Sequence, residues 1–293
     1  MRVSRRAPAI SLPFALGNRE REFLIKLVSY VFLSVGAFTM LVPFFWMVTT
    51  SFKEPAGIFK MPPEWIPDPF TLENYVKVWE KTELARGFVN SMIIAVTSTT
   101  GEILTSTLAG YAFARIRFRG RNTLFALLLS TMMIPGVVTM IASFTLFKYL
   151  GWLDSWRPLI VPLLLGSPFA IFLCRQFFAT LPQELADAAK VDGANQLQIY
   201  WQIFLPQAKP IIATLAVLGF IARWNDYLGP LIYVRTASKH PIALMLTALN
   251  TMYEKQWTLL MAGSMIALLP IIILFVALQR YFVESVALTG IKG

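Results

Sequence analysis

The stretch ELADAAKVDGANQLQIYWQIFLP, residues 184–206, lies between two hydrophobic stretches and is far more polar than either. The acids at its start favour the positive end of a helix, and Gly193 is typical of the left-handed residue that ends one. A second helix is expected to follow and to stop at Pro206, which cannot continue the backbone hydrogen bonding. Its apolar side is expected to hold Leu197, Tyr200, Trp201 and Phe204. The sequence therefore predicts a helix–turn–helix elbow within a polar segment at 177–209.

The first helix of this elbow carries small side chains on an apolar face, formed by Leu185, Ala188 and Ala189. Small residues allow another backbone to approach closely. The face therefore predicts a docking site for another protein. An amphipathic connector that lies at the membrane interface is the alternative.

The composition indicates a membrane protein. Hydrophobic residues make up 56% of the 293 residues and charged residues 14%, whereas soluble domains carry about 25% charged residues. A membrane-spanning helix needs about 20 mostly apolar residues. Stretches of this length predict an all-α membrane protein with six transmembrane helices. They are expected at 27–52, 87–114, 122–147, 158–174, 210–234 and 256–279, within a transmembrane domain at 27–293 that follows a polar arm at 1–26.

The basic residues predict the orientation. Six spans place both termini on one side of the membrane. If that side is the cytoplasm, the cytoplasmic segments hold 15 of the 26 lysines and arginines, with the cluster RIRFRGR at 115–121 as the strongest anchor. The positive-inside rule therefore predicts cytoplasmic termini and a cytoplasmic elbow. Since the basic residues lie at helix ends, their charge indicates topology and not nucleic-acid binding.

Glu102 is a carboxyl group within the second expected span, where ionisable residues are costly and often functional. Its expected hydrogen-bond partners are Thr99, Thr105 and Ser106, on adjacent helical turns. Two functional interpretations are a group that lines a substrate cavity and a proton relay. The structural interpretation is a buried, hydrogen-bonded residue of the helix packing.

Arg223 and Asp226 are expected on the fifth span, as part of one helix that continues to Val234. Residues three apart share a helix face, so the two can form a local ion pair. If Arg223 faces a cavity instead, it favours an acidic cargo, such as a uronic-acid oligosaccharide or a sugar phosphate. Trp224, Asn225 and Tyr227 complete this candidate group.

The sequence lacks the G-x-x-x-x-G-K-[ST] pattern that holds nucleotide phosphates. Cys174 is the only cysteine and His240 is the only histidine, which argues against a zinc site. We therefore expect no catalytic residue, metal or cofactor in this chain, and an energy source outside it.

The spacing within the elbow resembles the EAA coupling loop of ABC importer permeases. That pattern is EAA, three residues, Gly, nine residues and Ile-x-Leu-Pro. The chain matches it at every spacing, with Asp187 in the place of the usual Glu and with an additional acid at Glu184. The residues concerned are Glu184, Asp187, Ala188, Ala189, Gly193, Ile203, Leu205 and Pro206.

Other stretches extend the resemblance to nearly the whole chain. LAGYAFARIRFRGR at 108–121, MMIPGVV at 132–138 and RWNDYLGPL at 223–231 are similar to the carbohydrate-uptake branch, specifically to the subunit type of the maltose permease G protein. The resemblance implies a type I ABC importer permease of the bacterial inner membrane that imports oligosaccharides or related carbohydrates.

The resemblance also implies partners. They are a sister permease, two cytoplasmic ATPase subunits that bind ATP and magnesium, and an extracytoplasmic solute-binding protein. The elbow would lie in a cleft of an ATPase subunit. The resemblance further implies that the stretch WND at 224–226 lies near the outer half of the translocation path. The candidates for that path are Glu102, Arg223, Trp224, Asn225, Asp226 and Tyr227. A proton-coupled secondary transporter and a membrane scaffold without transport activity are the alternatives.

Overall fold

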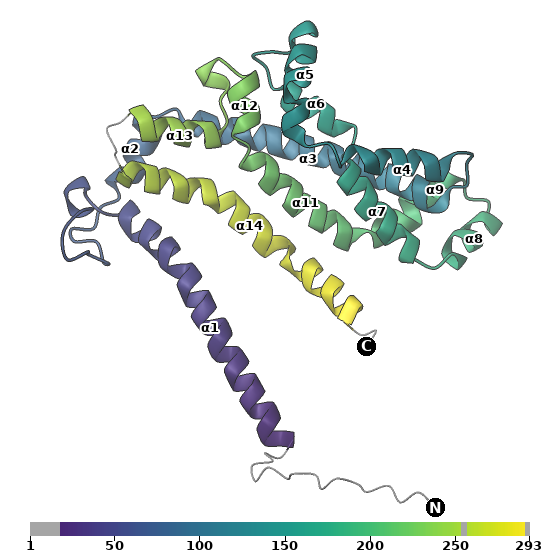
Figure 1. The fold of residues 1–293 in the computed structure, drawn as a ribbon, viewed down its shortest axis with the longest axis horizontal. Coiled ribbons are helices and arrows are strands. Elements are labelled where there is room, and N and C mark those ends of the chain that lie inside the picture. The colour runs from purple at the N-terminus through teal and green to yellow at the C-terminus, as the bar shows by residue number, and fades with distance from the viewer. Residues whose placement is uncertain (1–17, 253–256, 291–293) are drawn as a thin grey trace, which may run out of the picture.

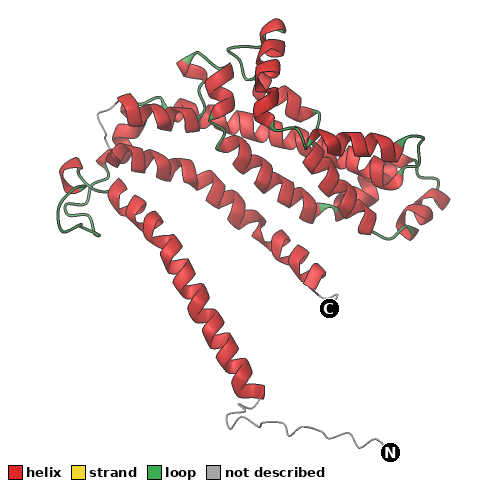
Figure 2. Ribbon diagram, in the orientation of Figure 1, coloured by secondary structure: helices red, strands yellow, loops and turns green. Residues whose placement is uncertain are grey.

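The computed structural model describes residues 18–252 and 257–290, and every regular element in these ranges is a helix (Figure 2). Residues 1–17 of the expected polar arm lie outside the described ranges, as do 253–256 and 291–293. The long helices are α1 (Asn18–Ser51), α3 (Leu84–Arg115) and α14 (Trp257–Gly290). The shorter helices are α2 (Glu73–Lys81), α4 (Arg121–Thr131), α5 (Gly136–Tyr149), α6 (Arg157–Leu164), α7 (Pro168–Thr180), α8 (Glu184–Val191), α9 (Gln196–Ile199), α10 (Leu205–Gln207), α11 (Lys209–Trp224), α12 (Leu228–Tyr233) and α13 (Ile242–Met252). The prediction of an all-α protein is confirmed for these residues.

Four to six segments of the described chain can cross a membrane. Four helical segments are long and apolar enough alone, namely Arg21–Ser51, Leu84–Arg115, Arg157–Thr180 and Trp257–Tyr281. Two further pairs are each bent at a short break: α4 with α5 by 95°, and the helical stretch Gln196–Gln207 with α11 by 75°. If each bent pair is one span, the total is six.

The breaks occur where the sequence cannot continue a helix. Pro135 precedes α5 in an extended conformation, and it lacks the N–H group that a continuous helix would need. Between α6 and α7, Gly166 adopts a positive φ of 83°. Ser167 then caps α7 by accepting a hydrogen bond from the N–H of Ala170.

The helix expected over 210–234 is not continuous. α11 ends at Trp224, and α12 begins only at Leu228. Between them, Asp226 Oδ1 accepts a hydrogen bond of 3.0 Å from the N–H of Gly229. A short acidic side chain in this position satisfies a free N–H at the start of a helix. Asp226 therefore initiates a new helix and does not continue the old one.

α3 lies at the centre of the fold and packs most extensively against α7, with further contacts to α11, α6 and α13 (Figure 1). One core cluster joins Tyr111, Cys174, Phe178 and Phe204, all of them buried. In contrast, α1 diverges from the other helices along most of its length (Figure 1). No residue in its most apolar 18-residue window is buried within this chain, although Thr49, Thr50 and Ser51 at its end are buried.

The close contact between α3 and α7 depends on Gly110. A Cβ atom at this position would clash with Cβ of Cys174 and would lie 2.9 Å from the backbone nitrogen of Arg175. Gly36 in α1 is the matched control, because a Cβ atom there would meet nothing within 4 Å.

We expect Gly110→Ala to destabilise the protein, since overpacking a tight contact costs about 1–3 kcal/mol. Gly36→Ala should be neutral or stabilising, because alanine is favoured over glycine within a helix by about 0.8–1 kcal/mol. Thermal unfolding of both variants in detergent checks this. Equal unfolding midpoints for the two variants would contradict the packing described for α3 and α7.

Candidate functional site

The elbow forms a helix–turn–helix in the structure. α8 ends at Val191 and Asp192 follows as its C-cap; Gly193 then adopts a φ of 83°, the left-handed conformation that its position in the sequence predicts. Asn195 then opens α9 with a capping box: its side chain accepts from the N–H of Gln198, and its own N–H donates to Gln198 Oε1. The turn is therefore specified by residues that lie close together in the sequence.

The second helix of the elbow does not stop at Pro206. Residues Tyr200–Phe204 form a π-helical turn, in which the N–H of Leu205 donates to the carbonyl of Tyr200. Pro206 follows in the first turn of α10, where a missing N–H is tolerated. The chain bends only after Gln207, at the start of α11.

Four residues are expected on the buried, apolar side of this second helix, and the prediction is wrong for two of them. Tyr200 and Phe204 are buried, but Leu197 and Trp201 are 63% and 57% exposed. Ile199, which is fully buried, takes their place in the core. The core lies against α3 and α7, so the helix buries the face that meets those helices.

The small-residue face expected on the first helix is partly buried and partly exposed. Ala189 is 7% exposed and packs in the same core cluster as Ile199, whereas Ala188 and Leu185 are exposed. Only Ala188 of the two alanines is thus available to another protein. With Val191, Leu197 and Trp201, it belongs to the exposed side of the elbow.

The two acids of the elbow differ in their surroundings. Asp187 Oδ1 accepts hydrogen bonds from Lys190 Nζ at 3.0 Å and from Gln183 Nε2 at 3.2 Å. The hydrogen bonds from Lys190 and then Gln183 hold the pKa of Asp187 below its ordinary value. Within the described residues, Glu184 makes no side-chain hydrogen bond and is exposed.

Two polar side chains of α3 hold the second helix of the elbow. The hydroxyl groups of Thr107 and Tyr200 are 2.9 Å apart. One turn further along α3, the hydroxyl of Tyr111 donates to Gln196 Oε1 at 3.0 Å. Both contacts join residues that are more than 80 positions apart in the sequence.

Arg115, a further turn along α3, holds the base of the elbow. Its guanidinium donates to the carbonyl oxygens of Phe178 and Leu181 and to Gln183 Oε1 at 2.8 Å. It also lies 4.9 Å from the ring centre of Phe204. Thr107, Tyr111 and Arg115 are not among the residues that the sequence pattern predicts to hold the elbow. Their spacing by four residues on an apolar helix was the available signal.

The partner of Glu102 is Arg223. Arg223 donates from one terminal nitrogen to Glu102 Oε2 at 2.6 Å, which joins α3 to α11. The side chain of Arg223 is only 12% exposed and that of Glu102 only 6%. The predicted pair between Arg223 and Asp226 is therefore wrong, since Arg223 points to α3 and the helix ends before Asp226.

The predicted hydroxyl partners of Glu102 are also wrong. Thr105 donates to the carbonyl oxygens of Gly101 and Glu102 in its own helix. The hydroxyl oxygens of Thr99 and Ser106 are buried, and neither has a hydrogen-bond partner within the described residues. Hydroxyl groups bond easily to a preceding carbonyl within a helix, which leaves the carboxylate to a partner on another helix.

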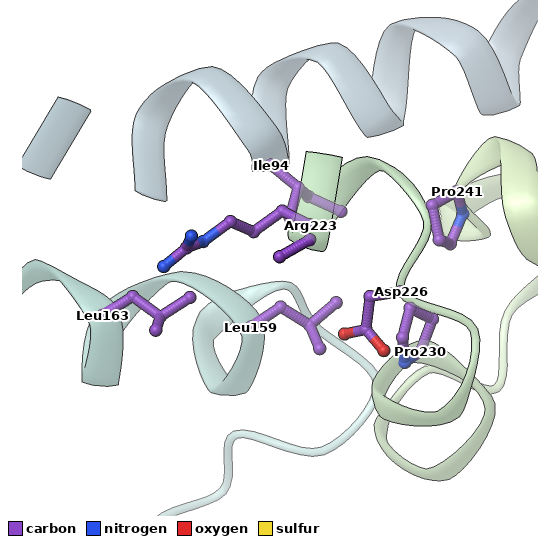
Figure 3. Close-up of a pocket in the computed structure, with 8 residues that line it drawn as sticks. Ile94, Leu159, Leu163, Arg223, Asp226, Pro230 and Pro241 are labelled. Atoms are coloured by element: carbon purple, nitrogen blue, oxygen red, sulfur yellow. The ribbon is translucent and has the colours of Figure 1, made fainter. Parts of the chain in front are cut away.

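The ion pair borders two cavities. Glu102, Arg223 and Phe169 line a cavity of about 380 Å³ next to α7 and α11. Arg223 and Asp226 line a second cavity of about 250 Å³ (Figure 3). In that cavity the guanidinium of Arg223 and the carboxylate of Asp226 point away from each other (Figure 3).

The structure does not bring the remaining candidates together with this pair. Trp224 is 1% exposed, stacks on Phe220 and donates from Nε1 to the carbonyl of Ala267 at 2.9 Å. Asn225 lines a separate cavity beside α13 and α14, and Tyr227 is 38% exposed. Trp224 therefore packs α11 against α14, while the roles of Asn225 and Tyr227 in a translocation path stay predictions.

No group of three or more potential metal ligands occurs among the described residues.

We expect Glu102→Gln or Arg223→Gln alone to destabilise the protein by about 3–5 kcal/mol, because each leaves one buried charge without its partner. The double variant should lose less than the sum of the two, since two amides can hydrogen-bond to each other. Asp226→Asn is the control, because its Oδ1 still accepts from Gly229. A double-mutant cycle of thermal unfolding measures the coupling. Strict additivity of the two single effects would contradict the ion pair.

Comparison with known proteins identifies the family. The model of the family described as "Binding-protein-dependent transport system inner membrane component" matches residues 102–288. The chain is 33% identical over 260 residues to the arabinooligosaccharides transport system permease protein AraQ of Halalkalibacterium halodurans, which covers 88% of this chain and 93% of that protein. It is 32% identical over 269 residues to the sn-glycerol-3-phosphate transport system permease protein UgpE of Yersinia pestis bv. Antiqua, which covers 89% and 95%.

A solved structure shares the fold. It belongs to a bacterial ABC transporter involved in the import of the acidic polysaccharide alginate, with a TM-score of 0.80, 26% identity, and coverage of 92% of this chain and all of that chain. The family match spans more than half of this chain, and the relatives match nearly all of it. The prediction from the EAA-like loop is confirmed: this chain is a permease that belongs to the family of inner membrane components of binding-protein-dependent transport systems.

Proposed function

We propose that this chain is the membrane-spanning subunit of an ATP-driven importer of oligosaccharides or related carbohydrates. The observation that carries the proposal is the elbow, whose inner face is fastened to α3 and α7 while its outer face leaves Ala188, Val191, Leu197 and Trp201 exposed. An anchored elbow with a free apolar face is suited to receive force from another protein. The sugar transport system that the name of the first relative describes supports the substrate class.

The proposed arrangement in the membrane has six spans, with α4–α5 and the Gln196–Trp224 pair each counted as one. Residues 1–26 form the N-terminal arm, residues 27–293 form the transmembrane domain, and residues 177–209 form the coupling loop. Both termini and the elbow are cytoplasmic. The arginines at 115–121 support this orientation, because Arg115 ties the elbow to the same end of α3.

The proposed partners are a sister permease, two ATPase subunits that bind ATP and magnesium, and a solute-binding protein. The name of the family and the ABC transporter of the solved structure support an ATPase and a binding protein. The exposed apolar stretch of α1 supports a contact with lipid or with a sister permease. Within the elbow, Glu184 is the acid that we assign to the ATPase contact, since Asp187 is engaged by Lys190 and Gln183.

The charge of the cargo is a separate proposal. Glu102 engages Arg223, so this arginine no longer supports an acidic cargo in the way that a free cation would. The similarity to a transporter for the acidic polysaccharide alginate is the observation that favours an acidic oligosaccharide as a second candidate.

The alternative functions have less support. A proton-coupled transporter would use Glu102 as its carrier, but the carboxylate is engaged by Arg223. A scaffold without transport activity is disfavoured because the chain belongs to a family of transport components.

The direct test is uptake of a neutral and of an acidic oligosaccharide into proteoliposomes that contain the complete transporter. We expect Ala188→Trp and Gly193→Val to abolish uptake of either cargo while the permease stays in the membrane. The tryptophan would obstruct the exposed face, and a β-branched residue is strained at a positive φ. Ala142→Trp, which adds a tryptophan at an exposed position of α5 outside the coupling loop, is the control. Undiminished uptake by both elbow variants would refute the proposed coupling role.

The orientation can be tested in intact cells with a membrane-impermeant thiol reagent on a Cys174→Ala background. A cysteine in place of Met61, which is 88% exposed, should react from outside. A cysteine in place of the exposed Asn122, which lies in the first turn of α4 beside the arginine cluster, should react only after the membrane is opened. Reaction of both cysteines in intact cells would exclude the six-span arrangement.

A further inference from the structure

α3 is the one unbroken helix among the described helices that hold the elbow. It has 32 residues, whereas α7 and α11 have 13 and 16 and end at breaks. Figure 1 shows α3 extending from beside α13 to beside α9, so that it reaches both ends of the fold. At 1.5 Å per residue, about 37 Å separates Asn90 from Arg115 along the helix.

The elbow end of α3 carries the stripe formed by Thr107, Tyr111 and Arg115. Residues spaced by four lie on one face of a helix, and each member of the stripe contacts a different part of the elbow. Thr107 meets the π-helical turn and Tyr111 meets the start of α9. Arg115 meets the end of α7 and Gln183. A displacement of any part of the elbow therefore acts on α3.

The opposite end of α3 holds residues 234–242, here called the far segment. Asn90 Nδ2 donates to the carbonyl oxygens of Ser238 and His240, both at 2.9 Å. Ser91 Oγ accepts from the N–H of Ile242 at 2.8 Å. Both side chains are buried, at 5% and 1% exposure. Separation of the far segment from α3 would thus leave buried polar groups unpaired, which is unfavourable.

The far segment is also fastened to the loop between α5 and α6. Asp154 accepts from the N–H groups of Arg235 and Thr236 and from Lys239 Nζ at 3.0 Å. The hydrogen bonds from Thr236 hold the pKa of Asp154 well below its ordinary value. In addition, Trp156 Nε1 donates to the carbonyl of Lys239 at 2.9 Å. A movement of the far segment therefore carries this second loop with it.

We propose that α3 transmits movement of the elbow to the far segment, with Thr107, Tyr111 and Arg115 as positioning residues at one end and Asn90 and Ser91 at the other. The argument is mechanical: an unbroken helix changes its length little, and its ends are fastened by specific side-chain hydrogen bonds. The assignment rests on the proposed function, in which an ATPase contacts the elbow, and on the proposed orientation, which puts the far segment at the extracytoplasmic end of α3.

The test uses the complete transporter in lipid nanodiscs and compares ATP hydrolysis with and without the cargo-loaded binding protein. Tyr111→Phe removes only the hydroxyl bonded to Gln196, and Asn90→Leu removes only the donors to the far segment. Tyr111→Phe should lower the stimulation of ATP hydrolysis by about fivefold, the effect of one lost hydrogen bond, and Asn90→Leu by at least as much, because it removes two. Assembly and basal hydrolysis should equal those of the parent. The double variant should lose little more than one single variant, because both changes interrupt the same transmission.

Matched controls have the same chemistry at exposed positions. Tyr149→Phe alters a side chain that is 89% exposed, and Asn122→Leu alters an exposed asparagine in α4. Neither should change the stimulation. If Asn90→Leu fails to assemble, Ser91→Ala replaces it as a smaller change that removes the acceptor for the N–H of Ile242.

A spin label reports the transmission directly. It is attached at Ala237 of the far segment, which is exposed, in a transporter without other cysteines. In the parent, ATP binding should change the spectrum of this label, and Tyr111→Phe at the other end of α3 should suppress that change. A role of Tyr111 in stability alone would lower the yield and leave the spectral change in the assembled transporter intact.

The outcomes separate the two proposals. A parent complex that shows neither uptake nor stimulation by a binding protein would overturn the proposed function. A functional parent whose stimulation and spectral change survive both Tyr111→Phe and Asn90→Leu would overturn the role of α3 alone.

Discussion

Backbone N–H and C=O groups have no water to bond with inside a bilayer, and this constraint shapes every part of the fold. It makes each apolar stretch a helix and permits a break only where another group completes the hydrogen bonding. Ser167 completes it at the start of α7, and Asp226 does so at the start of α12. The turn at Gly166 lies directly against Thr105 and Ser106 of α3. The unbroken α3 thus provides the surface on which a broken neighbour is supported.

The ion pair of Glu102 and Arg223 connects this central helix to α11. Burial of a charge in an apolar interior is unfavourable unless an opposite charge compensates for the lost hydration. The loss of either residue therefore leaves the other as an uncompensated buried charge. The pair lies between two cavities, so Arg223 both joins α11 to α3 and lines each of the two cavities. It changes the interpretation of charge in this region, because Asp226, which lines the second cavity, forms no ion pair within the described part of the chain.

The elbow illustrates how one short segment serves two surfaces. Its inner face shares a core with α3 and α7 through Ala189, Ile199 and Phe204. Its outer face leaves Leu197 and Trp201 exposed, an arrangement that is costly for a free protein in water and is typical of a binding surface. The attachment of the inner face to α3 and α7 is the structural feature behind our proposal that a force on the outer face reaches the membrane helices.

The sequence alone determined the features that depend on neighbouring residues. The apolar stretches predicted an all-α membrane protein, Gly193 predicted the turn of the elbow, and the spacing from Asp187 to Pro206 predicted the family. Only the tertiary structure decided which side of each helix is buried and which charges meet. Glu102 and Arg223 are 121 residues apart, and Tyr111 lies 85 residues from Gln196. Helical periodicity describes one helix at a time, whereas these contacts depend on how separate helices pack together.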